Sequence, residues 1–257
     1  MRNYNSIVVL GPTASGKTAL ACRLAYELNG EIISADSRQV YKGLDIGTGK
    51  DLHEYIVKDH IIPHHLIDVC SPDQQFYLHD FIRECDKAFE QILLRHHVPV
   101  ICGGTGLYLD ALIKDFSLTL IPENEALRST LISMRKDQLL QRLSSYPTQL
   151  TKHADLTSVK RIIRAIEIAE FLVSHPDHHY STPRPFRPYY IGVITDVNAR
   201  RQRIQQRLNV RLNNGMIEEV ERLLSEGVTH ERLQRLGLEY KFISMYLILV
   251  TDYNKRN

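Results

Sequence analysis

The residues with the clearest chemical meaning form a glycine-rich loop near the start of the chain. The loop reads Gly11-Pro-Thr-Ala-Ser-Gly-Lys-Thr18, a complete Walker A motif between a β-branched run and an amphipathic stretch. In such a loop the backbone N–H groups close around a diphosphate, the lysine reaches its oxygens and the hydroxyl suits a Mg²⁺ ion. We therefore expect Mg²⁺ as the cofactor, with Thr18 as a metal ligand. The expected diphosphate-binding residues are Gly11, Thr13, Ala14, Ser15, Gly16, Lys17 and Thr18.

The motif leaves open what the diphosphate belongs to. A nucleoside triphosphate and a prenyl diphosphate present the same group to the loop. In ATPases the motif usually works with an apolar strand that ends in Asp or Glu and helps to hold Mg²⁺. The apolar run Val98-Pro-Val-Ile-Cys102 instead continues into Gly103-Gly-Thr-Gly106. Motor and helicase functions are therefore disfavoured.

Asp36, at the end of the apolar run Glu31–Ala35, is a candidate proton acceptor. Taken alone, without its neighbours, it is better suited to cap a helix or turn. Gln39 has an amide that can pair bidentately with adenine, or can close a loop. Thr105 approaches the same region from a second glycine-rich turn. His60, His64 and His65 lack ordered acidic partners, and we expect them to be structural and not metal ligands.

The elements that position these residues alternate in the manner of an α/β protein. Three apolar runs, 6–10, 31–35 and 98–102, are each followed by a polar loop, and helical patterns cover 17–28, 78–95 and the stretch after 106. Such units predict a P-loop NTPase-like parallel sheet flanked by helices, with ligands beyond the carboxyl ends of the strands.

The second half is predicted to be mainly helical. Helical patterns cover 124–144 and 158–174, a strand is expected at 189–195, and helices are expected at 197–214 and 216–226, with breaks at Gly215 and Gly227. We expect a core of residues 1–121 and 189–257, interrupted by a smaller helical insert of residues 122–188.

Composition and charge exclude several classes. Hydrophobic residues make up 43% of the 257 residues and charged ones 24%, which suits a globular chain with a buried core. No run is long enough to span a membrane and no signal peptide is visible, and the four cysteines form no CxxC pair. We expect a cytoplasmic monomer with reduced thiols and no membrane partner.

The basic charge is concentrated in the second half. Residues 1–150 carry 15 Lys and Arg against 18 Asp and Glu, whereas residues 151–257 carry 17 against 12. Seven arginines and one acid lie between Arg184 and Arg211. Such a surface would attract phosphates, although a solvated helix face is an equal possibility.

Five ordered motifs resemble the tRNA dimethylallyltransferase family. They are Gly11–Thr18, Ser34-Ala-Asp-Ser-Arg-Gln-Val-Tyr41, Asp45-Ile-Gly-Thr48 with Lys50, Pro63-His-His-Leu-Ile-Asp68, and Gly103-Gly-Thr-Gly-Leu-Tyr108. The resemblance implies transfer of a dimethylallyl group from dimethylallyl diphosphate to N6 of an adenosine beside the anticodon of tRNA, with release of pyrophosphate. It also implies that Mg²⁺ and the loop hold the donor.

The resemblance assigns roles to matching residues. Asp36 would be the general base, Thr105 would lie at the reacting centre, and Arg203, or failing that Arg207, would neutralise the leaving pyrophosphate. The implied tRNA contacts are Asp36, Ser37, Arg38, Gln39, Thr105, Arg128, Lys160, Arg161 and Arg164.

Other functions remain open from the sequence. An adenylate prenyltransferase would use free AMP, ADP or ATP, and a small-molecule kinase is favoured only by the Walker A motif. A weakly active RNA-binding paralogue is suggested by the end of the chain, which departs from the family's basic, aromatic final helix. Thr157-Ser-Val-Lys160 also departs from the Asn-Asp or similar pair that the family usually has before its Arg-x-x-Arg helix. Both departures bear on tRNA affinity.

Overall fold

The computed structural model describes residues 4–113, 117–152, 154–176 and 186–256. It divides into two units, one made of residues 1–113 and 185–257 and the other of residues 114–184. The expected insert, 122–188, differs from the second unit by eight residues at its start and four at its end. Part of the Pro- and His-rich end of that insert, residues 177–185, lies outside the described residues.

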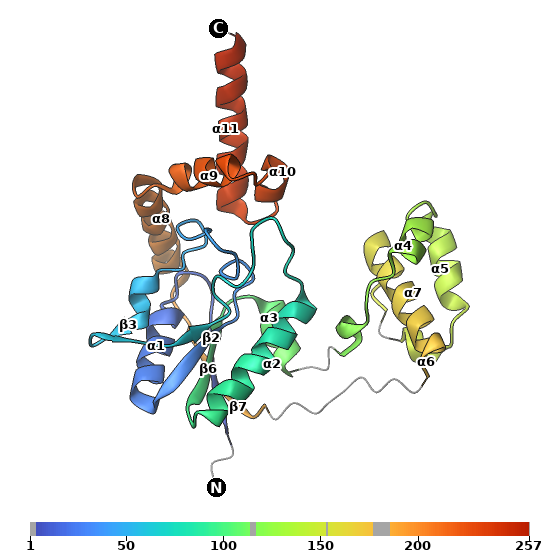
Figure 1. Ribbon diagram of the computed structural model, residues 1–257, viewed down its shortest axis with the longest axis horizontal. Coiled ribbons are helices and arrows are strands. Elements are labelled where there is room, and N and C mark those ends of the chain that lie inside the picture. Colours follow the sequence, from blue (N-terminus) through green and yellow to red (C-terminus); the bar gives the residue numbers. More distant parts are fainter. Residues whose placement is uncertain (1–3, 114–116, 153, 177–185, 257) are drawn as a thin grey trace. The chain divides into compact units, whose positions relative to one another are not determined.

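A five-stranded parallel sheet forms the centre of the first unit, in the order β5-β2-β6-β1-β7 (Figure 1). The strands are β1 (Ser6–Leu10), β2 (Gly30–Ser34), β5 (His64–His65), β6 (Val98–Gly103) and β7 (Pro188–Gly192). This confirms the predicted P-loop NTPase-like α/β fold. The last strand is shorter than expected, because it ends at Gly192.

Apolar side chains alternate between the two faces of this sheet. Val9, Ile32 and Val100 pack with Ala21 and Cys22 of helix α1 (Lys17–Leu28) in one buried cluster. Their neighbours Val8, Ile33 and Ile101 point to the other face and are equally buried. Burial on both faces is the pattern expected of a parallel sheet covered by helices on both sides. Helices α2 (Leu78–Leu94) and α3 (Gly106–Ile113) complete the strand–helix units.

The end of the chain builds a helical layer against a long loop. This layer consists of α8 (Val197–Asn213), α9 (Met216–Ser225), α10 (His230–Leu233) and α11 (Leu238–Arg256). Gly215 and Gly227 separate the helices with φ angles of 94° and 95°, as expected for left-handed breaks. A second core joins Val40 and Leu44 of the loop to Val220, Leu223 and Tyr240 of the helices. The loop after β2 is thereby fixed from outside the sheet.

Between the loop and α2 lies a small excursion that the sequence did not reveal. It comprises the 3₁₀ turn η1 (Leu52–Tyr55) and a hairpin of β3 (Ile56–Val57) and β4 (His60–Ile61). Tyr55 and Ile62 belong to the cluster under α1. The excursion thus anchors the far end of the loop.

The second unit is helical. Its elements are η2 (Ser117–Leu120), α4 (Glu125–Leu131), α5 (Lys136–Ser144), α6 (Thr148–Thr151) and α7 (Val159–Ser174). The helical stretch expected over 124–144 consists of two helices, α4 and α5. Leu131, Leu139, Ile162 and Ile166 share a buried core. No helix in the described ranges is both long and apolar enough to cross a membrane.

Candidate active site

The Walker A loop has the shape that an anion requires. Ala14 and Gly16 both adopt left-handed backbone angles, with φ of 60° and 83°, immediately before α1. A Cβ at Gly11 would lie 2.8 Å from the Val193 carbonyl oxygen, so the loop closes tightly where it leaves β1. Gly16, which caps α1, gives it no side-chain hydrogen bond. The first N–H groups of the helix, with their positive dipole end, therefore suit a phosphate.

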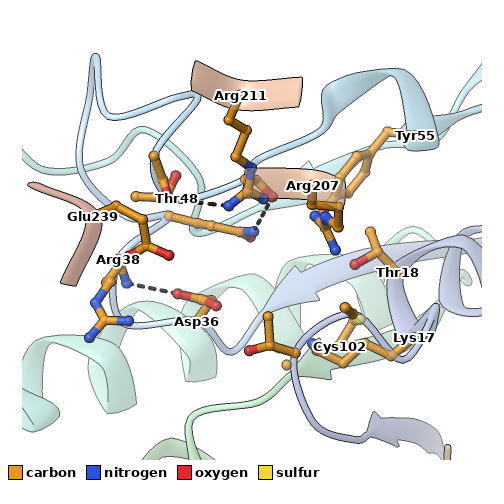
Figure 2. A pocket seen from close by; sticks show the side chains of 16 residues that line it. Lys17, Thr18, Asp36, Arg38, Thr48, Tyr55, Cys102, Arg207, Arg211 and Glu239 are labelled. Carbon is orange, nitrogen blue, oxygen red and sulfur yellow. Dashed lines mark hydrogen bonds between the residues drawn. The ribbon is translucent and has the colours of Figure 1, made fainter. Parts of the chain in front are cut away.

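Three segments meet in a hollow at the carboxyl ends of the strands, which we call the main hollow (Figure 2). The segments come from the Walker A loop, the loop after β2 and the end of β6, as the sequence predicted. Helices α8 and α11 add further side chains. The main hollow is lined by Thr13, Ala14, Lys17, Thr18, Asp36, Arg38, Gln39, Gly47, Thr48, Gly49, Tyr55, Cys102, Gly103, Arg207, Arg211 and Glu239.

Asp36 lies half-buried in this lining and also caps a turn. Its Oδ1 accepts a hydrogen bond of 2.9 Å from the Arg38 backbone N–H. The next residue, Ser37, donates its N–H to the Thr105 hydroxyl over 3.1 Å. The capping role and a place in the hollow, which the sequence offered as alternatives for Asp36, therefore occur together. Thr105 lies behind this turn and supports Ser37.

The ends of β2 and β6 approach each other closely. A Cβ at Gly103 would overlap the Ala35 carbonyl, and a Cβ at Gly104 would lie 3.6 Å from Lys17 Nζ. Only glycine permits this approach of two backbones. The close contact brings the Asp36 turn and the lysine of the Walker A loop to the same hollow.

Two arginines of α8 face the hollow from the side opposite the Walker A loop (Figure 2). They are Arg207 and Arg211, one helical turn apart. Arg211 Nη1 donates to the Gly47 carbonyl over 3.4 Å. Arg203, the arginine first expected at the pyrophosphate, lines a neighbouring hollow with Ala14, Gly16, Asp51, His53, Glu54, Gln206, Arg207, Val210 and Arg211. We call this second space the side hollow.

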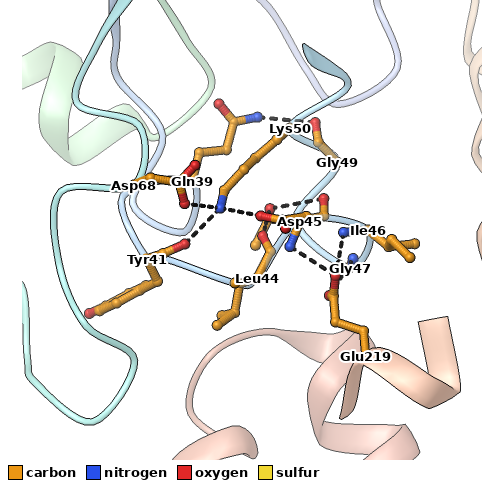
Figure 3. A network of polar contacts seen from close by, with 12 residues as sticks. Gln39, Tyr41, Leu44, Asp45, Ile46, Gly47, Gly49, Lys50, Asp68 and Glu219 are labelled. Atoms are coloured by element: carbon orange, nitrogen blue, oxygen red, sulfur yellow. Dashed lines mark hydrogen bonds and ion pairs between the residues drawn. The ribbon is translucent and has the colours of Figure 1, made fainter. Parts of the chain in front are cut away.

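The loop Asp45–Lys50 forms one wall of the main hollow, and a buried lysine holds it (Figure 3). Lys50 is 2% exposed. Its ammonium donates to the Tyr41 carbonyl at 2.8 Å, to Asp45 Oδ1 at 2.6 Å and to Asp68 Oδ1. All three N–H donors are therefore satisfied, as a buried charge requires. Gln39 ties the same loop by donating to the Gly49 carbonyl over 3.1 Å.

A buried carboxylate holds this loop from its other side. Glu219 of α9 accepts from the backbone N–H groups of Asp45, Ile46 and Gly47 at 3.0, 2.8 and 3.2 Å. The Tyr240 hydroxyl donates to the same carboxylate at 2.6 Å. Burial and the charge of Glu219 raise the pKa of Tyr240, so it stays a neutral donor. A Cβ at Gly47 would lie 2.5 Å from the Tyr240 ring, which explains the glycine.

Sequence reasoning missed several lining residues. The Asp45–Lys50 motif was recognised without a chemical role, although a lysine beside two glycines and a threonine is a possible loop anchor. Tyr55, Cys102 and Glu239 carried no local signal. Their side chains reach the hollow only because the sheet and α11 bring distant segments together.

The basic residues expected to contact RNA in the second unit fall into two groups. Lys160 and Arg161 are exposed at the start of α7. Arg128 and Arg164 instead surround the buried Glu167: Arg128 Nη2 lies 2.7 Å from its carboxylate, and Arg164 Nη1 lies 3.6 Å from it. Their contact with RNA stays a prediction. Within the unit, Arg128 joins α4 to α7, and Arg164 joins α7 to the carbonyl of Ile121.

His64 and His65 make side-chain contacts within the first unit. His64 packs on the Tyr55 ring with centroids 4.7 Å apart, and His65 pairs with Glu31 at 2.7 Å. The four cysteines are buried and form no disulfide. Burial raises the pKa of Cys102 to about 11, so the thiol in the hollow is not a ready nucleophile.

The fold and the hollow together define a P-loop α/β protein in which a carboxylate lies in the same hollow as the Walker A loop. An "IPP transferase" family model matches residues 39–256, and an "Isopentenyl transferase" model matches residues 4–61. The chain belongs to the tRNA dimethylallyltransferase family.

Similar proteins include a "tRNA dimethylallyltransferase 2" of Treponema denticola, 49% identical over 95% of this chain and 82% of that protein. A protein of the same name from Bacteroides fragilis is 46% identical over 99% of this chain and 83% of its own length. The solved tRNA isopentenylpyrophosphate transferase of Bacillus halodurans matches with a TM-score of 0.64 and 32% identity, over 95% of this chain and 77% of that one.

Proposed function

We propose that this chain transfers a dimethylallyl group from dimethylallyl diphosphate to N6 of adenosine 37, next to the anticodon of a tRNA. The observation that carries the proposal is the main hollow, where the Walker A loop, Asp36 and two arginines of α8 meet. The names of the relatives support both the reaction and the tRNA substrate.

The donor's diphosphate would lie on the Walker A loop. The backbone N–H groups at the start of α1 and the ammonium of Lys17 supply donors on one side. Arg207 and Arg211 supply cationic donors on the other. We favour Arg207 over Arg203 for neutralising the leaving pyrophosphate, because Arg207 and Lys17 line the same hollow. Charge that develops on a leaving pyrophosphate is stabilised best by such preorganised donors.

The donor set also suits the expected Mg²⁺ ion. Thr18 and Thr48 bring hydroxyl oxygens to the main hollow and Asp36 brings a carboxylate, which are the hard ligands that this cation prefers. Thr18 would hold the ion in the usual Walker A manner. When bound, Mg²⁺ would neutralise part of the negative charge of the diphosphate.

Asp36 would accept the proton of the nucleophile. The lone pair of adenine N6 attacks C1 of the dimethylallyl group, the C1–O bond to the diphosphate breaks, and the N6 proton passes to the Asp36 carboxylate. The turn bond from Arg38 N–H fixes the carboxylate while it faces the hollow. An adenine in the anticodon loop is single-stranded, so moving it into a pocket costs little.

The test is to incubate the protein with dimethylallyl diphosphate, Mg²⁺ and either unmodified tRNA or AMP, followed by digestion and nucleoside mass spectrometry. We expect N6-dimethylallyladenosine from the tRNA arm only. Product from AMP alone would identify an adenylate prenyltransferase. The absence of product in both arms would contradict the proposal.

A further inference from the structure

Asp51 lies where the main and side hollows share a wall. Its carboxylate forms an ion pair with Arg207, and Oδ2 lies 3.8 Å from Arg211 Nη2. Arg207 and Arg211 line both hollows, whereas Asp51 lines only the side hollow. Asp51 therefore contacts the two arginines from the side hollow.

The two arginines need a counter-charge. They are four residues apart on α8, and a Cβ at Gly49 would overlap the Arg211 guanidinium and lie 3.2 Å from Arg207 Nη2. Burial and the charge of Arg207 lower the pKa of Arg211. Two like charges in so confined a place repel each other. The Asp51 carboxylate is the acid in ion-pair contact with both among the described residues.

The backbone of Asp51 is held in an uncommon conformation that presents its side chain to α8. Its φ is 42° and its ψ is 49°, in the left-handed region. The side chain does not cap the 3₁₀ turn that it precedes. The ammonium of Lys50, immediately before it, donates three hydrogen bonds. The anchored lysine thus sets the position of the carboxylate.

We propose that Asp51 is an internal counter-anion, a positioning residue that holds Arg207 and Arg211 in place before the donor binds and competes with the diphosphate for them. This inference rests on the proposed function, because it takes the main hollow to be the diphosphate site. The carboxylate keeps the guanidinium groups ordered in the empty site. Its negative charge also weakens the binding of the pyrophosphate product to Arg207 and Arg211, which favours product release.

The experiment compares Asp51→Asn with the wild type in two measurements. Binding of inorganic pyrophosphate with Mg²⁺ is measured by titration calorimetry, and prenyl transfer to tRNA is measured in a single turnover at saturating donor. Loss of one negative charge beside the arginines is expected to tighten pyrophosphate binding by about 3–10-fold. Loss of their fixed orientation is expected to slow transfer by about tenfold.

Two further variants make the result specific. Asp51→Glu keeps the charge and should return the pyrophosphate affinity toward the wild-type value. Asp59→Asn removes an exposed carboxylate from the β3–β4 turn and should leave both measurements unchanged. A role in folding alone would instead weaken pyrophosphate binding in Asp51→Asn and lower its urea midpoint.

The outcomes separate this inference from the proposed function. If the wild type binds pyrophosphate and Asp51→Asn binds it equally well or more weakly, the counter-anion role is wrong. If the wild type does not bind pyrophosphate at all, the diphosphate site itself is wrong, and this inference is lost with it.

Discussion

Two buried charges of opposite sign hold one short loop. Lys50 binds Asp45 and Asp68 from within the loop region, and Glu219 binds three consecutive N–H groups from α9. Lys50 and Glu219 are both fully hydrogen-bonded, so together they position the Gly47–Gly49 wall without leaving a buried charge unpaired. The position of the Gly47–Gly49 wall determines where Arg211 can lie, because the Arg211 guanidinium packs directly on Gly49.

Replacement of Lys50 by methionine tests this anchor. Lys50→Met keeps the length of the side chain but leaves the Tyr41 carbonyl without its donor and removes the cation from Asp45 and Asp68, which are 58% and 40% exposed, so we expect a loss of about 1–3 kcal/mol in the free energy of unfolding. Urea denaturation measures it. The control Lys58→Met removes an exposed lysine 3.5 Å from Glu27 and should change stability by less than about 1 kcal/mol. Equal effects from the two variants would show that the Lys50 network contributes little.

Individual residues could be predicted where a short stretch contains the whole signal. Lys17, Thr18 and Asp36 stand in recognisable motifs, and all three line the main hollow. Spacing along a helix does not say which turn faces a loop some 160 residues earlier, so the sequence could not separate Arg207, which lines the main hollow, from Arg203, which lines the side hollow. The Asp51 contact depends on the same long-range packing and has no local signature.

At the scale of elements, β2 carries an anchor at each end. The site lies beyond its carboxyl end, and Glu31 lies near its start with an exposed fraction of 3%. Arg95 donates to the Glu31 carboxylate through Nε and Nη2 at 2.8 Å, and His65 and His97 each contact it at 2.7 Å. This cluster joins β2 to β5 and to the turn after α2.

The cluster gives stability a defined pH dependence. Burial would raise the pKa of Glu31, but hydrogen bonds from Arg95, His65 and His97 lower it to about 2, from 4.5. A lowered pKa means that the carboxylate stabilises the fold above pH 4.5, and that this contribution is lost as the pH falls toward 2. We expect Glu31→Gln to cost about 3 kcal/mol at pH 5 and clearly less at pH 3, measured by urea denaturation.

The exposed Glu27→Gln is the control for this experiment, since Glu27 is 65% exposed and pairs only at 3.5 Å with Lys58. Its effect should be small at both pH values. If the difference in free energy of unfolding between the wild type and Glu31→Gln stayed constant from pH 5 to pH 3, the lowered pKa of Glu31 would be contradicted.

Element boundaries were predicted well where glycine or apolar periodicity marks them, and poorly elsewhere. Helices α1, α2, α7 and α8 begin and end within about one residue of expectation. The break between α4 and α5 contains no glycine or proline. Side chains end and restart the helices instead: Ser133 donates to the Thr130 carbonyl, and the Gln138 side chain accepts from Arg135 N–H. Such caps compete closely with a continuous helix.

At the scale of the whole molecule, the chain leaves the sheet for the helical unit and returns to it. Strand β7 pairs with β1 although some 180 residues separate them. The sequence predicted the return of a strand, but not the sheet order, because each strand could pair with several neighbours. The basic excess of the second half is likewise divided between exposed groups and groups that hold the helical unit together.

Because some basic residues are exposed and others hold the helical unit together, substitutions at two arginines of α7 should have different effects. Arg161 is 61% exposed, so Arg161→Gln should reduce the slope of log tRNA affinity against log salt by about one unit, without loss of stability. Arg164 is 25% exposed and donates to the Ile121 carbonyl, so Arg164→Gln should mainly destabilise the helical unit. Filter binding across salt concentrations and thermal unfolding separate the two effects. Unchanged tRNA binding in Arg161→Gln would remove this surface from the RNA contact.

Transfer of the adenine N6 proton to the Asp36 carboxylate in the main hollow is the step on which the proposed reaction depends most. The most direct measurement is the single-turnover rate of dimethylallyl transfer to tRNA by Asp36→Asn, at saturating donor, with pyrophosphate and tRNA affinities measured alongside. The amide keeps the size and the turn bond but lacks the basicity. We predict a rate lower by about 10²–10⁴-fold with both affinities changed far less. Near-normal transfer with a loss of donor or tRNA affinity would contradict the account.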